Sequence, residues 1–327
     1  MNNKVSVAPM MDCTDRHDRY FLRLISKNIK LFTEMIVAKA IINGDRDKLL
    51  KFNLLEKPLC LQIGGSNPKE LAEATKIAVD YGYDEINLNL GCPSKKVQKN
   101  KFGACLMKEP NLVGDCVNEM VNACNLPISI KTRIGFDNYE NYKFLKEFIS
   151  IIKKAGSKTF IIHARKAILN KTPKQNLNIP PLNYDFVYKL KNDFSSDTII
   201  LNGGVDSIEK INNHLLKVDG VMIGRAAYHS PYFLADIERE IFNNKNIPTR
   251  FEVMEKMIPY IQEETKKGTR LNQIMRHTIG LFHGQKGSSN WKRYLSENMC
   301  IREADLQKVN HIMDHVKNNT INTSLGR

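Results

Sequence analysis

Several features are missing from this sequence, and each absence argues against a class of protein. No stretch approaches the roughly 18 uninterrupted apolar residues of a membrane-spanning helix, and the N-terminus has no apolar run followed by a small-residue cleavage site. We therefore expect a cytoplasmic protein with no membrane partner. Neither G-x-G-x-x-G after the first predicted strand nor G-x-x-x-x-G-K-[ST] occurs, so nothing favours a Rossmann or P-loop domain.

Cysteine is present, but not in a metal-binding pattern. The seven cysteines are odd in number and include no C-x-x-C pair. We therefore predict neither a disulfide framework nor a metal site. Most of these thiols fit the role of small buried apolar groups. A functional cysteine has to be identified from its position.

Acidic residues are too few to balance the basic ones. The 49 Lys and Arg residues exceed the 35 Asp and Glu residues, which leaves a formal net charge of +14. Such an excess makes a polyanion, and nucleic acid first, a candidate partner. From charge alone, a generally basic surface without a partner is an equal alternative.

Eight short apolar runs rich in β-branched residues predict strands that are buried on both faces, as in a parallel sheet. Segments of helical periodicity separate most of them, so we predict an α/β (β/α)8 barrel, with a doubly wound open sheet as the structural alternative. The predicted strands are Val5–Met10, Leu31–Val37, Leu59–Ile63, Glu85–Leu90, Ile128–Thr132, Thr159–His163, Thr198–Leu201 and Val221–Ile223. The clearest predicted helices are Pro68–Tyr81, Asn111–Cys124, Asn141–Lys154 and Ser207–Leu216.

The pattern changes near residue 242, after which no strand signal remains. We predict a barrel domain over residues 1–242 and a helical domain with a denser positive charge over residues 243–327. The predicted helices of the second domain are Phe251–Lys267, Leu271–Phe282, Trp291–Met299 and Asp305–Lys317.

Polar and charged residues stand where the predicted strands end. In a (β/α)8 barrel these ends meet on one face, where reactive residues lie. The outer helices alone would not require such residues there. The strand ends read Pro9-Met10-Met11-Asp12, Glu34-Met35, Gln62-Ile63-Gly64, Asn87 to Pro93, Lys131-Thr132-Arg133, His163-Ala164-Arg165, Asn202-Gly203-Gly204 and Gly224-Arg225.

The last two strand ends predict a phosphate site. The loops after strands seven and eight commonly hold phosphate in such barrels. Gly203, Gly204 and Gly224 would let backbone N–H groups approach an anion, and Arg225 adds a guanidinium. Two ordinary tight turns are the alternative, but both turns follow the strands where a phosphate site is expected.

A phosphate at those loops leaves room for a ring system over the barrel centre. A flavin needs hydrogen-bond partners along its pyrimidine edge and a positive charge near N1 and O2. Gln62 and Lys131 have that chemistry, and His163 is a further candidate partner. A lone histidine at a strand end is more often a satisfied core residue, but its neighbours here favour the functional interpretation.

Cys92 follows the fourth strand between Gly91 and Pro93, which places it on a turn at the predicted barrel mouth. We interpret it as a proton donor or nucleophile, whereas a structural role is the default for the other cysteines. Two basic loops that lack acidic residues flank this site and favour a phosphodiester substrate, although either loop alone fits a solvated surface. They contain Lys95, Lys96, Lys99, Lys101 and Lys108 in one loop, and Arg165, Lys166, Lys171 and Lys174 in the other.

Together these segments resemble the tRNA-dihydrouridine synthases, from Val7 to about Ala304. The segment GYDEINLNLGCPS is close to diagnostic, and the insertion RKAILNKTPKQNLNIPPLNY is similar to the bacterial branch that acts on positions 20 and 20a of the D-loop. Further matching segments are VAPMMDCTDRHDRYFLRL, LQIGGS, FGACLM, IKTRIG, FIIHARKA, LNGGV, GVMIGRAAY and WKRYLSEN.

The resemblance implies FMN as cofactor, NADPH as reductant, tRNA as partner and Cys92 as the catalytic residue. Asn89, Lys174 and Lys292 match positions that touch tRNA, and we expect Arg165 to join Asn89 at the polar edge of a flipped-out uracil. The positions that match the family's FMN-binding residues are Pro9, Met10, Met11, Gln62, Lys131, His163, Asn202, Gly203, Gly204, Gly224 and Arg225.

Four positions depart from the family pattern. Relatives of this branch usually carry Arg where this chain has Leu177, Ser289 and Lys292, and Lys lacks the planar bidentate fork of Arg. Cys13 departs without a clear consequence. Three alternatives to the tRNA reductase remain from sequence: an FMN barrel oxidoreductase of a free pyrimidine, a non-catalytic tRNA-binding protein, and a lyase that uses Lys131 as a Schiff base.

Overall fold

The computed structural model describes residues 4–298 and Asp314. Apart from Asp314, the predicted helix Asp305–Lys317 lies outside the described residues, as does Cys300. Among the helices of the described part, none combines the length and the apolar composition needed to cross a bilayer.

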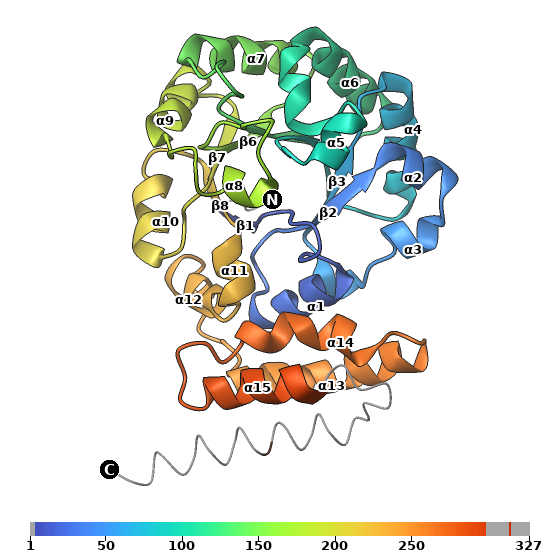
Figure 1. The fold of residues 1–327 in the computed structure, drawn as a ribbon, viewed down its shortest axis with the longest axis vertical. Coiled ribbons are helices and arrows are strands. Elements are labelled where there is room, and N and C mark those ends of the chain that lie inside the picture. Colours follow the sequence, from blue (N-terminus) through green and yellow to red (C-terminus); the bar gives the residue numbers. More distant parts are fainter. Residues whose placement is uncertain (1–3, 299–313, 315–327) are drawn as a thin grey trace. The chain divides into compact units, whose positions relative to one another are not determined.

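Eight parallel strands form the sheet in the order β1-β8-β7-β6-β5-β4-β3-β2 (Figure 1). A single bridge between Ser6 and Lys30 brings β1 next to β2, and the N–H of Val7 donates to the carbonyl of Lys30 at 2.9 Å. The prediction of a (β/α)8 barrel is therefore confirmed. The strands are β1 Val5–Val7, β2 Leu31–Val37, β3 Leu59–Gly64, β4 Glu85–Leu90, β5 Ile128–Arg133, β6 Thr159–His163, β7 Thr198–Asn202 and β8 Gly220–Ile223.

The first strand is shorter than predicted. Its pairing with β8 ends after Val7, and the last bond runs from the N–H of Ala8 to the carbonyl of Ile223 at 2.7 Å. Pro9 follows and has no N–H to continue the ladder. The residues Pro9 to Asp12 can therefore form a turn at the end of the barrel.

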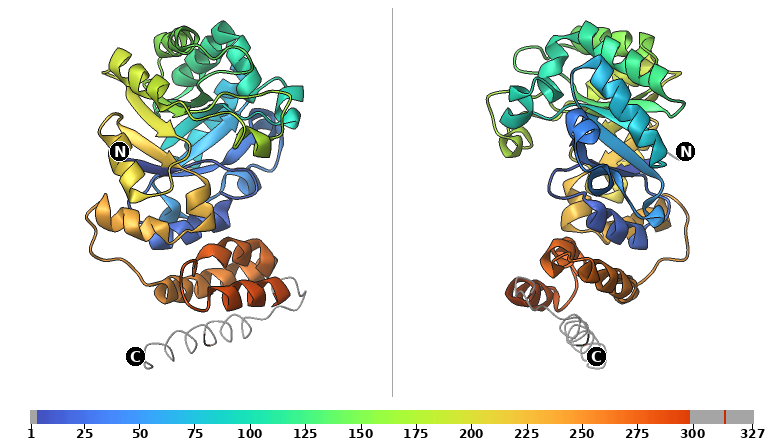
Figure 2. Two further views of the ribbon diagram at one scale, coloured as in Figure 1. Left: turned by 60° about the vertical axis from the view of Figure 1, so that its left-hand side comes forward. Right: turned by 90° about the vertical axis from the view of Figure 1, so that its right-hand side faces the viewer.

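Helices lie outside the strands (Figure 2), and local signals fix their ends. In α4, Asn67 caps the first turn, Pro68 opens the helix, and Gly82 follows its end at φ +81°. The helices of the barrel are α2 Ala38–Asn43, α3 Arg46–Leu50, η1 Leu54–Glu56, α4 Pro68–Asp80, α5 Lys95–Lys99, η2 Gly103–Lys108, α6 Pro110–Ala123, α7 Tyr142–Lys154, α8 Pro173–Asn176, α9 Tyr184–Asp193 and α10 Ile208–Leu215.

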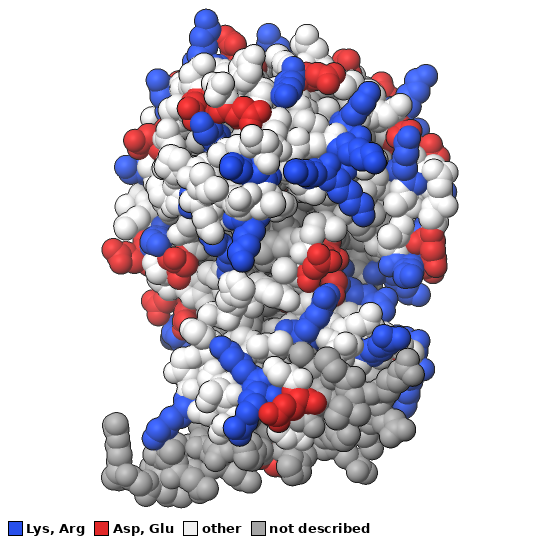
Figure 3. All heavy atoms as spheres, in the orientation of Figure 1, with Lys and Arg blue, Asp and Glu red and all other residues white. Residues whose placement is uncertain are grey.

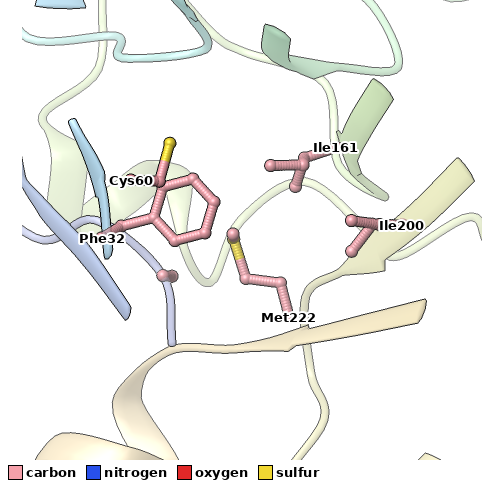
Figure 4. Packing of buried hydrophobic residues seen from close by; sticks show 6 residues of the cluster. Phe32, Cys60, Ile161, Ile200 and Met222 are labelled. Atoms are coloured by element: carbon pink, nitrogen blue, oxygen red, sulfur yellow. The ribbon is translucent and has the colours of Figure 1, made fainter. Parts of the chain in front are cut away.

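The barrel interior is divided between apolar and polar side chains. Figure 4 shows the apolar part, where buried side chains from β2, β3, β6, β7 and β8 converge on one another. The polar part lies on β3, β4 and β5, whose alternate side chains are hydrophilic and buried. The apolar cluster comprises Ala8, Phe32, Cys60, Ile161, Ile200 and Met222, and the buried polar residues include Gln62, Glu85, Asn87, Asn89 and Ser129.

The chain folds into two compact units. The first comprises residues 1–12 and 30–224 and contains the whole sheet, whereas the second comprises residues 13–29 and 225–327. The predicted functional division between residues 242 and 243 remains a prediction. The second unit contains α1 Arg16–Ile25, α11 Arg225–His229, α12 Phe233–Glu240, α13 Arg250–Lys266, α14 Leu271–Met275, η3 Arg276–Gly280 and α15 Ser288–Asn298.

The second unit has its own buried centre, to which Trp291 contributes a fully buried ring. Its indole N–H donates to the carbonyl of Thr278 at 3.0 Å. The predicted helix over 271–282 is divided into α14 and η3, and Gly280 packs so closely against the backbone of His229 that an added Cβ would lie 2.4 Å from its carbonyl oxygen.

Candidate active site

A chain of side-chain hydrogen bonds connects the ends of β3 and β4. The amide of Gln62 accepts from Nδ2 of Asn89 at 2.8 Å and donates to Oδ1 of Asn87 at 2.8 Å. Asn89 Oδ1 in turn accepts from the backbone N–H groups of Gly91 at 3.1 Å and of Cys92 at 3.0 Å. Two residues predicted to bind different ligands, Gln62 and Asn89, are therefore bonded to each other and to the Cys92 turn.

The Cys92 turn is also held from its other side. The N–H of Ala104 donates to the carbonyl of Cys92 at 3.0 Å, and Gly103, at φ +76°, permits this approach because an added Cβ would lie 2.6 Å from that carbonyl oxygen. Nε of Arg133 donates to the carbonyl of Gly91 at 2.8 Å. Four hydrogen bonds thus fix the backbone on both sides of the thiol.

Burial raises the pKa of the Cys92 thiol, although a hydrogen bond from the Ser94 backbone and the positive charges of Arg133 and Lys131 act against this shift. The thiol form is therefore the stable form of Cys92 near neutral pH. A thiol can give up a proton, whereas a thiolate is the form that attacks as a nucleophile. The direction of this pKa shift is that expected of a proton donor rather than of a nucleophile.

Lys131 and Asn202 meet across the mouth from β5 and β7. The Lys131 ammonium uses one of its three N–H donors on Asn202 Oδ1, and Asn202 is itself oriented by donating to the carbonyl of Met222 at 2.8 Å. Desolvation and the charge of Arg133 lower the pKa of Lys131 to about 7. An anionic ligand nearby would favour the protonated amine.

The two predicted phosphate loops approach their neighbours closely. Gly203, at φ +117°, lies against the His163 ring, since an added Cβ would be 2.8 Å from Cδ2 of that ring. Gly204 also has a positive φ, +72°, and an added Cβ would lie 2.6 Å from the Tyr184 hydroxyl oxygen. Gly224 lies near Met10 of the turn after β1. The missing Cβ atoms of Gly203 and Gly204 therefore make room for the side chains of His163, Leu182 and Tyr184, which pack against these turns.

The remaining predicted site residues are distributed over both units. In the barrel, Pro9 is partly buried and Met11 is 54% exposed beside the mouth, while Arg165 donates to the carbonyl of Pro180. Arg225 opens α11 and Lys292 lies exposed on α15, both in the second unit. The roles predicted for these and the other site residues remain predictions.

The basic loop after Cys92 forms α5 and a turn. Its lysines Lys95, Lys96, Lys99 and Lys101 are partly or fully exposed, and Figure 3 shows Lys and Arg side chains gathered over α5. Gln98 anchors this segment, because its Nε2 donates to the carbonyls of Pro93 and Leu169, both at 2.8 Å. The same amide therefore ties the Cys92 loop to the insertion after β6.

A buried asparagine shapes that insertion. Asn176 is fully buried, accepts from the N–H of Ile168 at 2.7 Å, and donates to the carbonyls of Ile168, Lys171 and Thr172. This arrangement leaves Lys174 exposed on α8. Within the described residues, no group of three or more His, Cys, Asp or Glu side chains could hold a metal ion.

The sequence patterns assigned no individual role to Arg133, Gly103, Gln98 or Asn176, although Arg133 stood among the strand-end residues. The motifs IKTRIG and FGACLM contain the first two, so the sequence contained a signal without showing the contacts. The side chains of Gln98 and Asn176 bond to backbone groups, and no residue pattern marks that pairing.

The site residues fit a flat anionic cofactor that carries a phosphate. Gln62 would supply an amide at a ring edge, Lys131 would supply a positive charge once protonated, and the glycine turns after β7 and β8 would lie at the phosphate. These groups lie on strands of one barrel, at the end where their carboxyl termini meet.

Comparisons with known proteins agree with this geometry. The family described as Dihydrouridine synthase (Dus) matches residues 6–318. Proteins named tRNA-dihydrouridine(20/20a) synthase are similar over nearly the whole chain. One from Synechocystis sp. is 50% identical over 92% of this chain and 91% of its own length. One from Vibrio parahaemolyticus is 52% identical over 90% of this chain and 91% of its own length. One from Escherichia coli K12 is 48% identical over 95% of this chain and 91% of its own length.

Proposed function

Since the chain belongs to the dihydrouridine synthase family, we propose that it reduces the C5=C6 bond of uridine at positions 20 and 20a of tRNA, with bound FMN and with NADPH as reductant. The proposal rests above all on the Cys92 turn, whose thiol is kept protonated by burial and whose backbone is bonded to Asn89, which is bonded in turn to Gln62. FMN, when bound, would pass a hydride from NADPH to C6 of the uracil.

The protein groups have separate tasks in this reaction. Hydride arrival at C6 leaves negative charge on C5 and O4, and Cys92 gives its proton to C5. Arg133 and Lys131 provide positive charge near the resulting thiolate. The thiol is then restored by a proton from solvent.

Substrate binding requires the uracil to leave its stack and enter the barrel mouth. Arg165, on the loop after β6, and Asn89, near the end of β4, would supply N–H donors for the polar edge of the base, with Asn89 using the amide hydrogen that Gln62 does not accept. The lysines of α5 and Lys174 would contact the phosphodiester backbone. Pro9, Met10 and Met11 would line the cofactor, with Gly224 and Arg225 at its phosphate.

The test follows the visible spectrum of the purified protein, reconstituted with FMN where necessary, without oxygen. A flavin spectrum that bleaches with NADPH and recovers with unmodified tRNA, but not with free uridine, supports the proposal. Recovery with a free pyrimidine would replace it with a small-molecule oxidoreductase. Transcripts that carry uridine only at position 20 or only at 20a then distinguish the two positions by the dihydrouridine formed.

A further inference from the structure

The polar half of the barrel interior contains a continuous chain of hydrogen bonds that ends on the Cys92 turn. Ser129 donates to Oε1 of Glu85 at 2.5 Å, and Nδ2 of Asn87 donates to the Ser129 hydroxyl at 2.9 Å. Asn87 then connects to Gln62, and Gln62 connects to Asn89. Lys30 forms an ion pair with the other oxygen of Glu85.

The Glu85 carboxylate determines which group donates and which accepts in every hydrogen bond of this chain. A carboxylate can only accept, so the Ser129 hydroxyl must donate to Glu85 and accept from Asn87. The NH2 group of Asn87 is then committed to Ser129, and its oxygen faces Gln62. The same logic turns the NH2 group of Gln62 towards Asn87.

The orientation of the last amide in the chain, that of Asn89, is fixed in the same way. The Gln62 oxygen faces Asn89, so Asn89 directs its NH2 group at Gln62 and its oxygen at the N–H groups of Gly91 and Cys92. A reversed chain would place the Asn89 NH2 group against two N–H donors. Only one direction therefore leaves the Cys92 turn hydrogen-bonded.

We infer that Glu85 is a positioning residue, which sets the direction of the Ser129–Asn87–Gln62–Asn89 chain and thereby holds the Cys92 turn and the Gln62 amide in their working orientation. Its importance for uridine reduction rests on the proposed function, but the orientation itself is a property of the protein alone. The carboxylate lies fully buried and accepts from three donors, because Cys60 Sγ also lies 3.7 Å from Oε1.

Lys30 makes Glu85→Gln an informative substitution. The new amide would direct its oxygen at the Lys30 ammonium and its NH2 group at Ser129, because the opposite orientation would place two donors together. Ser129 would then donate to Asn87, and each amide in the chain would reverse. Asn89 would present N–H donors to the N–H groups of Gly91 and Cys92, and the turn would lose both hydrogen bonds.

The experiment measures alkylation of Cys92 by iodoacetamide in the cofactor-free full-length protein, peptide by peptide, with Cys105 and Cys116 as internal references. Loss of two hydrogen bonds should raise the Cys92 rate roughly tenfold in Glu85→Gln. The reference rates should not change. Hydrogen exchange of the peptide that contains Gly91 and Cys92 should rise in parallel.

Variants at Ser129 separate direction from the buried ion pair. Ser129→Ala interrupts the chain but leaves Lys30 and Glu85 paired. Because nothing then enforces the reversed direction, the Cys92 rate should rise less than in Glu85→Gln, and Ser129→Thr should keep the wild-type rate. Combining Ser129→Ala with Glu85→Gln should give no further increase over Ser129→Ala alone. Without the Ser129 hydroxyl, the residue at position 85 no longer determines the orientation of Asn87. Equal rises at all three cysteines, a wild-type Cys92 rate in Glu85→Gln, or additive effects would each overturn the inference. A protein that fails to reduce tRNA but shows this pattern would refute the proposed function alone.

Discussion

Lys131 Nζ lies 3.0 Å from Oδ1 of Asn202, a contact that joins the ends of β5 and β7 over the barrel interior. Desolvation and Arg133 lower the pKa of this lysine to about 7, so much of it is neutral in the cofactor-free protein above that pH. An anionic flavin would raise the pKa again. The contact therefore links cofactor binding to proton uptake.

We predict that FMN binds more weakly as the pH rises from 7 to 9, because the protein must take up a proton to charge Lys131. The FMN phosphate has lost its second proton by pH 7 and does not contribute over this range. Calorimetry in two buffers of different ionisation enthalpy counts the protons. The Lys131→Met variant should bind FMN weakly at every pH and take up no proton. The Lys154→Met variant, changed at an exposed position on α7, should bind FMN like the wild type. Equal proton uptake in Lys131→Met would contradict the assignment.

Replacing Cys92 with Ala should lower dihydrouridine formation by roughly 10²–10⁴-fold, the usual contribution of a positioned proton donor. Bleaching of the flavin by NADPH should keep its wild-type rate, because that step does not use the thiol. Stopped-flow measurement of the two half-reactions separates these effects. Cys105→Ala removes a half-buried thiol that donates to the carbonyl of Phe102 and provides the control. Slowed bleaching in Cys92→Ala would argue for a different role.

The α5 lysines should contribute to tRNA affinity, and their contribution should be visible in how the affinity depends on salt concentration. Removing one lysine–phosphate interaction should reduce the slope of log K against log salt by roughly 0.7–0.9. We therefore expect Lys95→Glu with Lys96→Glu to weaken tRNA binding and flatten the slope. Lys154→Glu alters an exposed lysine where α7 ends, before the amino end of β6, and so on the other side of the barrel from the mouth. Equal weakening in this control would show a general charge effect, measured by filter binding at several salt concentrations.

Gly203→Ala should reduce FMN affinity by more than its effect on stability explains. The new methyl group would meet the His163 ring as well as strain a backbone with φ +117°. Gly82 also has a positive φ, +81°, but open space surrounds it. Gly82→Ala should therefore destabilise the protein by about 1 kcal/mol without changing FMN affinity. Flavin fluorescence titration and urea unfolding of both variants provide the comparison.

His17 should make the second unit sensitive to mild acid. Its ring is buried and bonded to the Tyr260 hydroxyl at 2.7 Å, and burial lowers its pKa to about 4. The unfolded chain thus binds a proton that the folded unit does not between pH 6.5 and 4. Stability is complete above pH 6.5 and falls by up to about 1.4 kcal/mol per pH unit below it. In His17→Gln this part of the pH dependence should vanish in thermal unfolding curves between pH 4.5 and 7.5. An unchanged dependence would assign it elsewhere.

The sequence predicted the barrel and the composition of its mouth because both follow from repeated, local signals. Parallel strands place their carboxyl ends together, so Gln62, Lys131, His163 and Asn202 could be grouped from their strand-end positions alone. The bonds between them could not be predicted in this way. Whether Lys131 reaches Asn202, and whether Asn89 bonds to Gln62 or to a substrate, depends on the register and curvature of neighbouring strands.

The contacts that could not be predicted from the sequence join residues that are far apart in the chain and share no motif. Lys30 precedes a strand and Glu85 begins another, and each alone reads as an ordinary surface charge. Their pairing inside the barrel requires the sheet to bring β2 and β4 together around β3. Likewise, the segment 13–29 follows the first strand, where the first outer helix of the barrel is expected, but it folds with residues after 224.

Pairing of β1 with β8 has a consequence for the order in which the protein takes shape during synthesis. Val5 leaves the ribosome before its ladder partner Val221, which emerges only after strands β2 to β7. Long-range pairing of this kind is slow to form. The β1–β8 side of the barrel must therefore close late, so the glycine turns after β7 and β8 should not yet face the turn after β1 in nascent chains that stop before Gly224.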